Sequence, residues 1–472
     1  MRQIDTDICI IGAGSGGLSV AAGAVQMGAR VVLIEGGEMG GDCLNAGCIP
    51  SKALIAAAKA AQAMRDGARY GITPVEPEVD FGAVKDHVAQ VIQTIAPIDS
   101  QERFEGLGVQ VIRAWARFTG PDSVEAGETR IKARRFVIAT GSRPLVPPIP
   151  GAESVPYLTN ETIFDLRERP AHLMIIGGGP IGMEMAQAHR RLGCQVTVIE
   201  GSRALGRDDP ELAAVVLHRL RAEGVDILED AEVTALAGAA GDITVTLKDG
   251  RTVQGSHLLI AVGRKVHLES LNLEAAGVQH DRKGVTVGAD LRSSNRRVYA
   301  VGDAAGGLQF THVAGYHAGI VIRQIVLGLP AKARTRHIPW VTYTDPELAQ
   351  VGLTEAEARK EHGAGVTVLC QEFHHNDRAQ AEGKTTGLLK VMVVKGRPVG
   401  VSIVGPQAGE LIGLWAFAIA SRAKISAIAG MVAPYPTLGE ISKRAAGAYF
   451  SPKLFDNPML KRFVRLVQRV LP

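Results

Sequence analysis

The sequence predicts an α/β protein with two Rossmann-like domains followed by an α+β domain toward the C-terminal end. Two glycine-rich turns, each between a short apolar strand and a helix, carry the first part of this prediction. From about Pro339 onward strands alternate with amphipathic helices, which predicts a separate domain. The length of 472 residues agrees, because it suggests about three domains of ~150 residues each.

The first glycine turn spans residues 12–17 and reads Gly-Ala-Gly-Ser-Gly-Gly. A buried strand is predicted at residues 4–11, a helix from about Ser15 to Met27, and a second strand that ends at Glu35. In such a unit the glycines let the backbone approach a pyrophosphate, the helix N-terminus binds it, and the acid accepts hydrogen bonds from an adenosine ribose. The predicted ligand-binding residues are Gly12, Gly14, Gly17 and Glu35.

The same pattern recurs at residues 173–200. A strand at 173–176 leads into the turn at 177–182, a helix follows to about Leu192, and a strand at 196–199 ends beside Glu200. The first glycine and the acid are 23 residues apart in both copies. Two motifs with equal spacing favour two dinucleotide sites over glycine-rich turns that bind nothing. The second set of candidates is Gly177, Gly179, Gly182 and Glu200.

A cysteine motif, GGDCLNAGCIPSK at residues 40–52, follows the first unit. A disulfide needs Cα atoms about 4.4–6.8 Å apart, so residues 45–47 must distort a helix for Cys43 and Cys48 to pair. Pro50 suits the first turn of a helix that runs to about Met64. The helix N-terminus and Lys52 should therefore lower the pKa of Cys48. A zinc site needs further ligands at suitable spacing, and none accompanies this pair, so we predict redox chemistry and no metal site.

Composition narrows the class of protein. Apolar residues make up 46% and charged residues 21%, as in ordinary soluble proteins, and the formal net charge is +4. These values give no reason to expect a nucleic-acid partner. The first residues lack a signal-peptide pattern, and no apolar run reaches the ~18 residues of a membrane span. We therefore expect a cytoplasmic protein.

With these motifs the chain resembles the class I pyridine nucleotide–disulfide oxidoreductase family, which includes dihydrolipoamide dehydrogenase, glutathione reductase and mercuric reductase. The resemblance covers about 450 of the 472 residues, and segments 139–144, 261–264, 300–303 and 343–347 support it. It implies an FAD-dependent NAD(P)H:disulfide or dithiol oxidoreductase. The implied enzyme is a homodimer with shared active sites, acting on a small-molecule or carrier-protein disulfide.

The resemblance also implies roles for individual residues. Cys43 would meet the substrate, Cys48 would face the flavin, and Lys52 would lie near flavin N5, paired with Glu184. The residues implied for FAD are Gly12, Gly14, Gly17, Glu35, Gly41, Thr140, Gly141, Gly302 and Asp303. Those implied for the nicotinamide dinucleotide are Gly177, Gly179, Gly182, Glu200 and Gly263. Glu200 favours NAD(H) over NADP(H), because a carboxylate repels a 2′-phosphate, although Arg203 nearby argues the other way.

The chain departs from the family where a catalytic histidine is usual. Residues 435–440 read Tyr-Pro-Thr-Leu-Gly-Glu, so Tyr435 stands in place of the base while Glu440 is present. A tyrosine titrates near 10 and a histidine near 6.5, so we expect Tyr435 to donate a proton and activity on ordinary dithiols to be weak. The alternative is that Tyr435 only packs in the pocket. By resemblance, mercuric reductase also has tyrosine at this position, and Tyr157 resembles the other active-site tyrosine of that enzyme. The C-terminal cysteine pair of mercuric reductase, however, is missing from this sequence.

The predicted organisation has five parts. They are an FAD-binding domain with the cysteines at 1–150, an NAD(P)-binding domain at 151–275, a second FAD-binding part at 276–338, a dimerisation domain at 339–450 and a basic amphipathic tail at 451–472. We expect the tail to pack on its own dimer, with a weak membrane or partner contact as the alternative. His374 and His375 are expected in a loop or interface. Alternative functions are a mercuric reductase-like metal-thiolate reductase, a flavin NAD(P)H oxidase, and an electron-transfer component of a larger complex.

Overall fold

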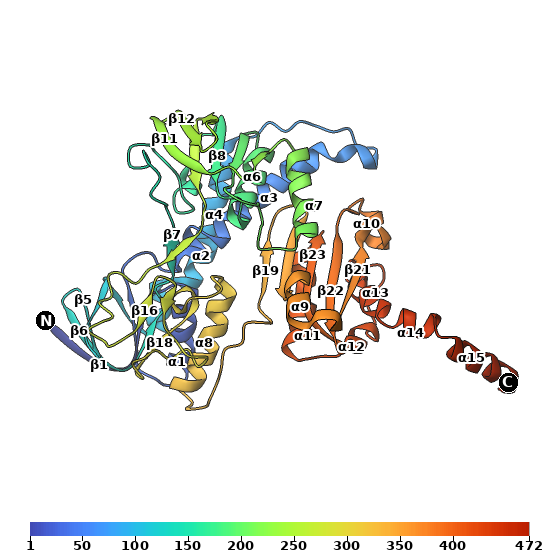
Figure 1. The fold of residues 1–472 in the computed structure, drawn as a ribbon. Helices are drawn as coiled ribbons and strands as arrows, with labels where there is room; N and C mark the ends of the chain where they lie inside the picture. The colour runs from blue at the N-terminus through green and yellow to red at the C-terminus, as the bar shows by residue number, and fades with distance from the viewer. Residues whose placement is uncertain (472) are drawn as a thin grey trace. The chain divides into compact units, whose positions relative to one another are not determined.

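The structure is a computed structural model that describes residues 1–471 (Figure 1). It divides into two compact units. The first comprises Met1–Gly201 and Leu228–Arg334, and the second comprises Ser202–Ile227 and the chain from Thr335 onward. The predicted fold class is confirmed, because two sheets with parallel strands lie in the first unit and an antiparallel sheet with helices lies in the second.

A seven-stranded sheet organises the first domain of the first unit. Its strands lie in the order β3-β2-β1-β6-β5-β4, and β18 pairs with the last residues of β6, 136–138. The first three strands, β6 and β18 pair in parallel, whereas β4, β5 and β6 pair antiparallel. The strands are β1 (Arg2–Ile11), β2 (Val31–Glu35), β3 (Gln110–Arg113), β4 (Ala116–Gly120), β5 (Ser123–Ala126), β6 (Thr129–Ile138) and β18 (Val298–Ala300).

Six helices belong to the same domain, and those predicted after the first glycine turn and after the cysteines are confirmed. The helices are α1 (Ser15–Gln26), α2 (Gly41–Asn45), α3 (Cys48–Arg65), α4 (Phe81–Asp99), α5 (Gln101–Gly106) and α8 (Thr311–Ile325). α1 and α8 pack on each other, which brings residues near 311 to the first glycine turn. The N-terminus of α8 therefore lies close to the N-terminus of α3, the helix that begins at Cys48.

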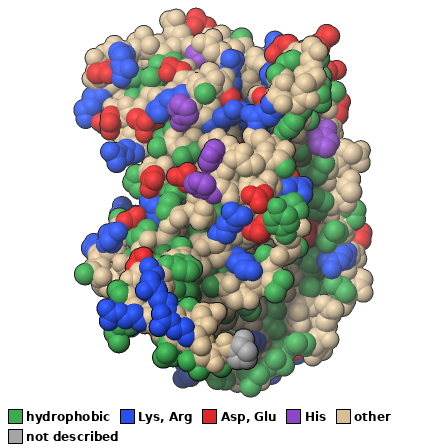
Figure 2. Space-filling model, turned by 90° about the vertical axis from the view of Figure 1, so that its right-hand side faces the viewer, with side chains coloured by type: hydrophobic (Ala, Val, Ile, Leu, Met, Phe, Trp, Pro, Cys, Tyr) green, Lys and Arg blue, Asp and Glu red, His purple; other side chains and the backbone are tan. Residues whose placement is uncertain are grey.

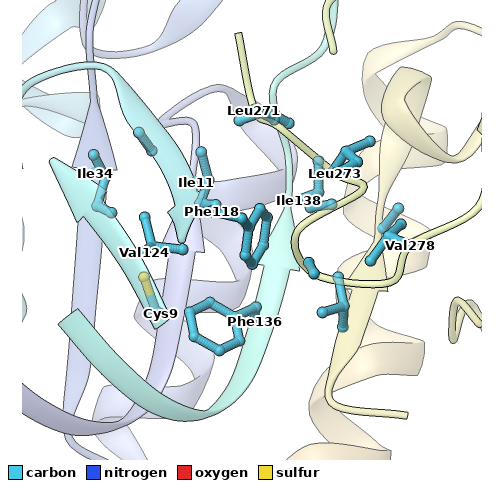
Figure 3. Close-up of a cluster of buried hydrophobic side chains, with 14 of the residues drawn as sticks. Cys9, Ile11, Ile34, Phe118, Val124, Phe136, Ile138, Leu271, Leu273 and Val278 are labelled. Atoms are coloured by element: carbon cyan, nitrogen blue, oxygen red, sulfur yellow. The ribbon is translucent and has the colours of Figure 1, made fainter. Parts of the chain in front are cut away.

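An apolar core lies against this sheet (Figure 3). The rings of Phe118 and Phe136 meet edge to face with centroids 5.3 Å apart, and both are fully buried. Such a pair stabilises the fold by about 0.5–1.5 kcal/mol beyond the burial of its area. Cys9 lies in the same core, where burial raises the pKa of its thiol well above the usual range. Cys9 is therefore a packing residue without thiolate chemistry.

The second glycine turn follows β8, a strand of a second, four-stranded sheet with the order β10-β9-β8-β14. The helix after it is α6 (Pro180–Arg191), with the proline at its first position, where no N–H is needed. β8 pairs in parallel with both neighbours, and β11, β12 and β13 form a separate antiparallel sheet. The strands here are β8 (His172–Ile176), β9 (Gln195–Ile199), β10 (Asp226–Leu228), β11 (Val233–Ala239), β12 (Asp242–Leu247), β13 (Thr252–Gly255) and β14 (His257–Ile260).

Two small antiparallel pairs of strands complete the first unit. One pair includes the end of the motif at residues 139–144, and the other lies in the segment that leads to β18. The strands are β7 (Ser142–Pro144), β15 (Arg264–Val266), β16 (His280–Asp281) and β17 (Gly284–Val285). The pairing of β7 with β15 places Arg264 opposite Pro144, so two of the family-like segments are neighbours in space.

The second unit is built on a five-stranded antiparallel sheet with the order β19-β20-β23-β22-β21. Its core includes the fully buried Trp415, whose indole N–H donates to Ser442 Oγ at 3.1 Å. The strands are β19 (Pro339–Thr342), β20 (Glu347–Gly352), β21 (Val366–Glu372), β22 (Leu388–Val394) and β23 (Arg397–Gly405). The helices are α7 (Pro210–Ala222), α9 (Glu355–His362), α10 (Asp377–Ala381), α11 (Ala408–Ala420), α12 (Ile425–Ala429), α13 (Glu440–Ala448), α14 (Ser451–Phe455) and α15 (Pro458–Val470).

A buried lysine holds α7 and α9 to this sheet. Lys390 on β22 donates to Asp209 at 3.0 Å, to Glu211 at 2.7 Å and to Glu355 at 3.1 Å. Burial lowers the pKa of Lys390, but the three carboxylates outweigh it, so its pKa lies above the usual value. The segment that carries α7 therefore has a buried ionic anchor in the second unit.

Two features toward the chain end complete this unit. His374 and His375 lie in a short 3₁₀ turn, Phe373–His375, within the connection between β21 and α10, where a loop was expected. No residue of α15 is buried. Among residues 1–471, no helix combines the length and apolarity that crossing a membrane requires.

Candidate functional site

Each glycine of the first turn has a different reason to be glycine. Gly12 has a positive φ of 105°, and a Cβ there would overlap the carbonyl of Ala139. A Cβ on Gly17 would overlap the carbonyl oxygen of Gly12. At Gly14, by contrast, an added Cβ would meet only Gly41 Cα, at 3.9 Å. The fold itself therefore requires Gly12 and Gly17, whereas the open space at Gly14 is what a bound pyrophosphate needs.

The second turn repeats this division of roles. Gly177 has a φ of 113°, and a Cβ there would overlap the carbonyl of Ala261. A Cβ on Gly182 would overlap the carbonyl oxygen of Gly177, but one on Gly179 would meet nothing within 4 Å. Both turns thus leave open space above their middle glycine, at the start of a helix whose first N–H groups have no partner within the helix.

The two predicted acids occupy equivalent positions. Glu35 accepts hydrogen bonds from the N–H of Ala13 at 2.5 Å and of Gly37 at 2.6 Å. Glu200 accepts from the N–H of Gly178 at 2.7 Å. Each carboxylate is therefore held at the rim of its own glycine turn, where it can reach a ribose beside the pyrophosphate.

The cysteine motif begins against the first turn. Gly40 N–H donates to the carbonyl of Ala13 at 3.0 Å, and Gly41 has a φ of 62°. A Cβ on Gly41 would approach Gly14 Cα to 2.8 Å. The backbone of Gly41 is therefore pressed against the middle glycine of the turn, which joins the cysteine motif to the first dinucleotide turn.

Thr140, whose backbone lies beside Gly12 of the first turn, has a buried hydroxyl. Thr140 Oγ1 is buried and has no hydrogen-bond partner within residues 1–471. Gly141, with a φ of 65°, has nothing within 4 Å of an added Cβ. A buried polar atom normally finds a partner, so this orphaned hydroxyl beside open space fits a polar ligand such as FAD.

Asp303 and Ser142 meet beside this space. Ser142 Oγ donates to Asp303 Oδ2 at 2.5 Å and accepts from Arg264 Nε at 2.7 Å. Burial raises the pKa of Asp303, although the hydrogen bond from Ser142 works against that rise. Gly302, just before it, has a φ of 59°, and a Cβ there would press on Ala314 of α8. The carboxyl is therefore held in a fixed orientation, as a ligand for a ribityl chain must be.

Gly263, the remaining predicted glycine, makes no close contact of this kind in the structure. It has a φ of 142°, and an added Cβ would meet nothing within 4 Å. Its neighbour Arg264 has a clearer part, because Nη2 lies 3.2 Å from Asp42 Oδ2 and also donates to the carbonyl of Ser142 at 2.9 Å. Arg264 links the cysteine motif to the Ser142–Asp303 pair.

The backbone between the two cysteines breaks as predicted. α2 ends at Asn45 and α3 begins at Cys48, so residues 46 and 47 separate two helices. Asn45 Nδ2 donates to the carbonyls of Met39 at 3.0 Å and Gly41 at 2.9 Å. A Cβ on Gly47 would press on Asp42 at 2.8–2.9 Å. These contacts define a tight turn that brings the two sulfurs together.

The two thiols have unequal acidity. Both are free cysteines, and a hydrogen bond joins their sulfurs. The pKa of Cys48 is lowered to about 6, mainly by the bond from Cys43 and further by Thr311 Oγ1 at 3.3 Å and the charge of Lys52. Desolvation of the sulfur acts in the opposite direction but is outweighed. The same bond, together with burial, raises the pKa of Cys43 well above the usual range. Cys48 is therefore the thiolate at neutral pH, and Cys43 keeps its proton.

Lys52 and Glu184 form an ion pair next to this thiolate. Lys52 lies one turn after Cys48 on α3, and its Nζ is 2.8 Å from Glu184 Oε2. Glu184 comes from α6, and its side chain is only 6% exposed, against 39% for Lys52. The pair joins the cysteine helix to the helix of the second glycine turn.

Sequence analysis missed two residues that hold this site. Thr311, the first residue of α8, bonds Cys48 from 263 positions away. Asn160 Nδ2 donates to Asp42 Oδ1 at 2.9 Å and to the carbonyl of Ala46 at 3.1 Å. The signal for Arg264 was present, because it lies in a family-like segment, but nothing in the sequence pointed to Thr311 or Asn160.

Tyr435 and Glu440 lie in the second unit. Tyr435 is 70% exposed, and its hydroxyl donates to Asp377 Oδ2 at 3.1 Å. That bond and the charge of Asp377, with Glu440 adding to them, raise the pKa of Tyr435 above its usual value. Glu440 Oε2 is buried and has no hydrogen-bond partner in the part of the chain that the structure describes. Tyr435 is therefore a neutral hydroxyl at physiological pH. Asp377 is a third residue that sequence analysis missed.

Two dinucleotide turns beside a pair of thiols, one of them acidic, define an oxidoreductase that couples a flavin and a pyridine nucleotide to thiol–disulfide exchange. The chain belongs to the pyridine nucleotide-disulphide oxidoreductase family: the family model matches residues 6–318, and the model of its dimerisation domain matches residues 338–446. It is thus an FAD-dependent enzyme of this class, and the family uses FAD with a pyridine nucleotide.

Relatives of known name agree with this assignment. The chain is 34% identical to a mercuric reductase of Lysinibacillus sphaericus over 453 residues, covering 94% of this chain and 83% of that protein. It is 32% identical to a dihydrolipoyl dehydrogenase of Geobacillus stearothermophilus over 458 residues, covering 94% and 96%.

Solved structures show the same fold. The HOCl-induced flavoprotein disulfide reductase RclA of Escherichia coli matches with a TM-score of 0.84 and 28% identity, over 93% of this chain and 99% of that one. RclA is also known as a Cu(II) complex. LpdA of Mycobacterium tuberculosis matches with a TM-score of 0.86 and 25% identity, over 95% and 100%.

Proposed function

We propose that the enzyme reduces a disulfide at the expense of NAD(P)H, with Cys43 and Cys48 as the dithiol that carries the two electrons. The observation that supports this most strongly is the turn at residues 46 and 47, which brings Cys43 close to Cys48 at the start of α3, where Thr311 contacts Cys48 and Lys52 follows one turn later. FAD, when bound, passes the two electrons of the nicotinamide hydride to this pair. The reverse reaction, oxidation of a dithiol with NAD⁺, uses the same residues.

The exchange balances as two displacements. Cys43 first gives its proton to Cys48 and then, as the thiolate, attacks one sulfur of the substrate disulfide. A mixed disulfide forms, and the first thiolate leaves and takes the proton from Cys48. The Cys48 thiolate then attacks Cys43 Sγ, which closes the Cys43–Cys48 disulfide and releases the second. Two electrons from NAD(P)H restore the dithiol, and a proton from solvent neutralises the second released thiolate. This order gives Cys43 the substrate and leaves Cys48 for the flavin.

The cofactor-binding residues follow from the two turns. We assign FAD to the first turn and the segments packed on it, with Lys52 and Glu184 beside the flavin ring. That set is Gly12, Gly14, Gly17, Glu35, Gly41, Thr140, Gly141, Gly302 and Asp303. We assign the nicotinamide dinucleotide to the second turn, with Gly177, Gly179, Gly182, Glu200 and Gly263.

A Cys43→Ser variant tests the central claim. Anaerobic NADH should still reduce its flavin, but turnover with every disulfide in a panel should be lost. In the wild type the same titration should produce the long-wavelength absorption of a thiolate beside oxidised flavin. Full turnover in the variant, or turnover that survives thiol alkylation after NADH reduction, would instead indicate a flavin NAD(P)H oxidase.

We further propose NADH as the preferred nucleotide, because Glu200 sits at the rim of the second turn. A Glu200→Ser variant should raise kcat/KM for NADPH relative to NADH, since it removes the repulsion of the 2′-phosphate. An unchanged ratio would show that Arg203 or another cation sets the preference.

We also propose a homodimer in which Tyr435 and Glu440 reach the Cys43 of a second copy; the dimerisation domain supports this. Mixing Cys43→Ser chains with Glu440→Gln chains tests it. Mixed dimers contain one site with both residues intact, so activity should appear only after subunit exchange. No recovery in verified mixed dimers would mean that each site is built from one chain.

Reduction of a thiolate-bound metal ion is a second candidate. Tyr435 in place of the usual histidine favours it, and named relatives include mercuric reductases. The discriminating assay compares NADH oxidation with Hg(II) in excess thiol against the disulfide panel. A higher kcat/KM for the metal thiolate would replace the disulfide as the proposed substrate.

A further inference from the structure

The α15 helix separates its side chains into two faces. At about 100° per residue, its apolar side chains and that of Leu471 just after it fill an arc of about 160°. These apolar residues are Met459, Leu460, Phe463, Val464, Leu466, Val467, Val470 and Leu471. The opposite arc holds Pro458 at the first helical position and, beyond it, only Lys461, Arg462, Arg465, Gln468 and Arg469. The separation is complete, as in helices that lie at a membrane interface.

Six of the eight apolar side chains are exposed, and the other two, Leu460 and Val467, are half-buried. Exposure ranges from 48% at Val464 to 77% at Met459 among the exposed side chains, and no residue of α15 is buried. Figure 2, which faces the end of the chain, shows Lys and Arg side chains beside exposed hydrophobic ones in its lower half. An exposed apolar surface of this kind marks an interaction site.

The net positive charge of the chain equals the charge that this helix contributes. The whole sequence has 52 basic and 48 acidic residues, and α15 contributes four basic residues and no acidic one. The remainder is therefore balanced, with 48 of each. A polar face that is only cationic, on an otherwise neutral chain, complements an anionic surface.

We infer that α15 binds the surface of an anionic lipid bilayer, with its axis in the plane of the membrane. The apolar arc enters the boundary between headgroups and acyl chains, and the four cations remain beside the lipid phosphates and carboxylates. The helix is about 20 Å long, shorter than the ~30 Å hydrocarbon core, so it lies on the membrane and does not cross it. Packing on a second copy would use the apolar arc but would leave the cationic face without a partner.

The helix has its own start signal. Asn457 Oδ1 accepts from the N–H groups of Met459 and Leu460 at 3.0 and 3.2 Å, and Pro458 occupies the first helical position. A capped helix orders its two faces before it meets the membrane, so less conformational entropy is lost on binding.

Flotation of the full-length holoenzyme with vesicles tests the inference. Vesicles of one part phosphatidylserine to two parts phosphatidylcholine should carry the enzyme, and pure phosphatidylcholine should carry much less. Salt near 1 M should weaken binding, because it shortens the Debye length from about 10 to about 3 Å. Replacing Arg465 and Arg469 by Gln should lower the partition coefficient by about thirtyfold, since each cation contributes about fivefold.

A variant of unchanged composition isolates the role of the two faces. Exchanging Phe463 with Arg465 and Val467 with Arg469 keeps charge and hydrophobicity but places two cations in the apolar arc, and it should abolish flotation. The matched control is Arg296→Gln with Arg297→Gln, which removes two charges from a five-arginine depression in the first unit and should leave flotation unchanged.

Three results would overturn the inference. They are no flotation with phosphatidylserine vesicles, flotation retained by the exchanged variant, and equal loss in the Arg296/Arg297 control. Dissociation of the dimer on deleting residues 458–472 would also overturn it, because α15 would then pack on a second copy. Flavin reduction by NADH, measured on every variant, keeps this test separate from that of the proposed function.

Discussion

Removing the hydroxyl of Thr311 should make Cys48 a weaker acid. The Cys48 pKa is about 6, and the bond from Thr311 Oγ1 at 3.3 Å contributes to it after the larger effect of Cys43. A hydrogen bond to a charged group is worth about 1.5–3 kcal/mol. Neighbouring groups partly desolvate the Cys48 sulfur, but its side chain is exposed to solvent, which screens the interaction, so we take the lower end. At about 1.4 kcal/mol per pKa unit, Thr311→Val should raise the pKa by about one unit.

The assay follows the ultraviolet absorbance of the thiolate in the reduced protein from about pH 5 to about pH 9. Because the pKa of Cys48 is depressed, the thiolate is present above the midpoint and disappears as the pH falls through it. The midpoint should lie near 6 in the wild type and near 7 in Thr311→Val. Thr311→Ser, which keeps a hydroxyl, should titrate like the wild type. An unshifted midpoint in Thr311→Val, or an equal shift in Thr311→Ser, would refute the role of the hydroxyl.

Three further predictions concern the turns, the second unit and the substrate side. In the FAD-free protein, Gly17→Ala should lower the free energy of unfolding by about 1–3 kcal/mol, because its Cβ overlaps the carbonyl oxygen of Gly12. Gly14→Ala should unfold like the wild type but bind little FAD. Equal thermal midpoints for the two variants would contradict this prediction. Lys390→Met should lower the free energy of unfolding by about 3–5 kcal/mol at neutral pH, because it leaves the buried carboxylate of Asp209 without this cation. A raised lysine pKa stabilises fully below its unfolded value near 10.4, so denaturant titration at pH 7 measures the whole effect, and a loss under 1 kcal/mol would contradict it. Tyr435→His should raise dihydrolipoamide oxidation by about 10²-fold or more across the pKa of the new imidazole, and an unchanged rate from pH 6 to 9 would contradict it.

The parts of the site that could be predicted are those whose chemistry is local in sequence. Each dinucleotide turn, with its strand, helix and acid, lies within about 30 residues, so spacing alone placed Glu35 and Glu200 at equivalent positions. The break between Cys43 and Cys48 followed from the geometry of a disulfide. These features need no knowledge of how distant segments meet.

The remaining parts depend on contacts between distant segments. Thr311 reaches Cys48 from 263 positions away, and Asn160 reaches Asp42 from 118. Asp377 lies 58 positions from Tyr435, on the short helix after the histidine pair. Neither a hydroxyl nor a carboxylate at the start of a helix has a sequence pattern of its own, so their roles appear only in the fold. The same holds for Ser202–Ile227, which follows the second dinucleotide motif in sequence but belongs to the second unit.

The proposed exchange requires a group that accepts the proton of Cys43. Cys43 holds its proton in the bond to Cys48, so it becomes a nucleophile only when that proton leaves. A histidine base would accept it, but the raised pKa of Tyr435 makes this residue a donor at neutral pH. Within the thiol pair, the acceptor is then the Cys48 thiolate itself. Such a site should favour substrates whose leaving thiol has a low pKa, because these leave fastest without prior protonation, so the exchange rate should fall as the pKa of the leaving thiol rises.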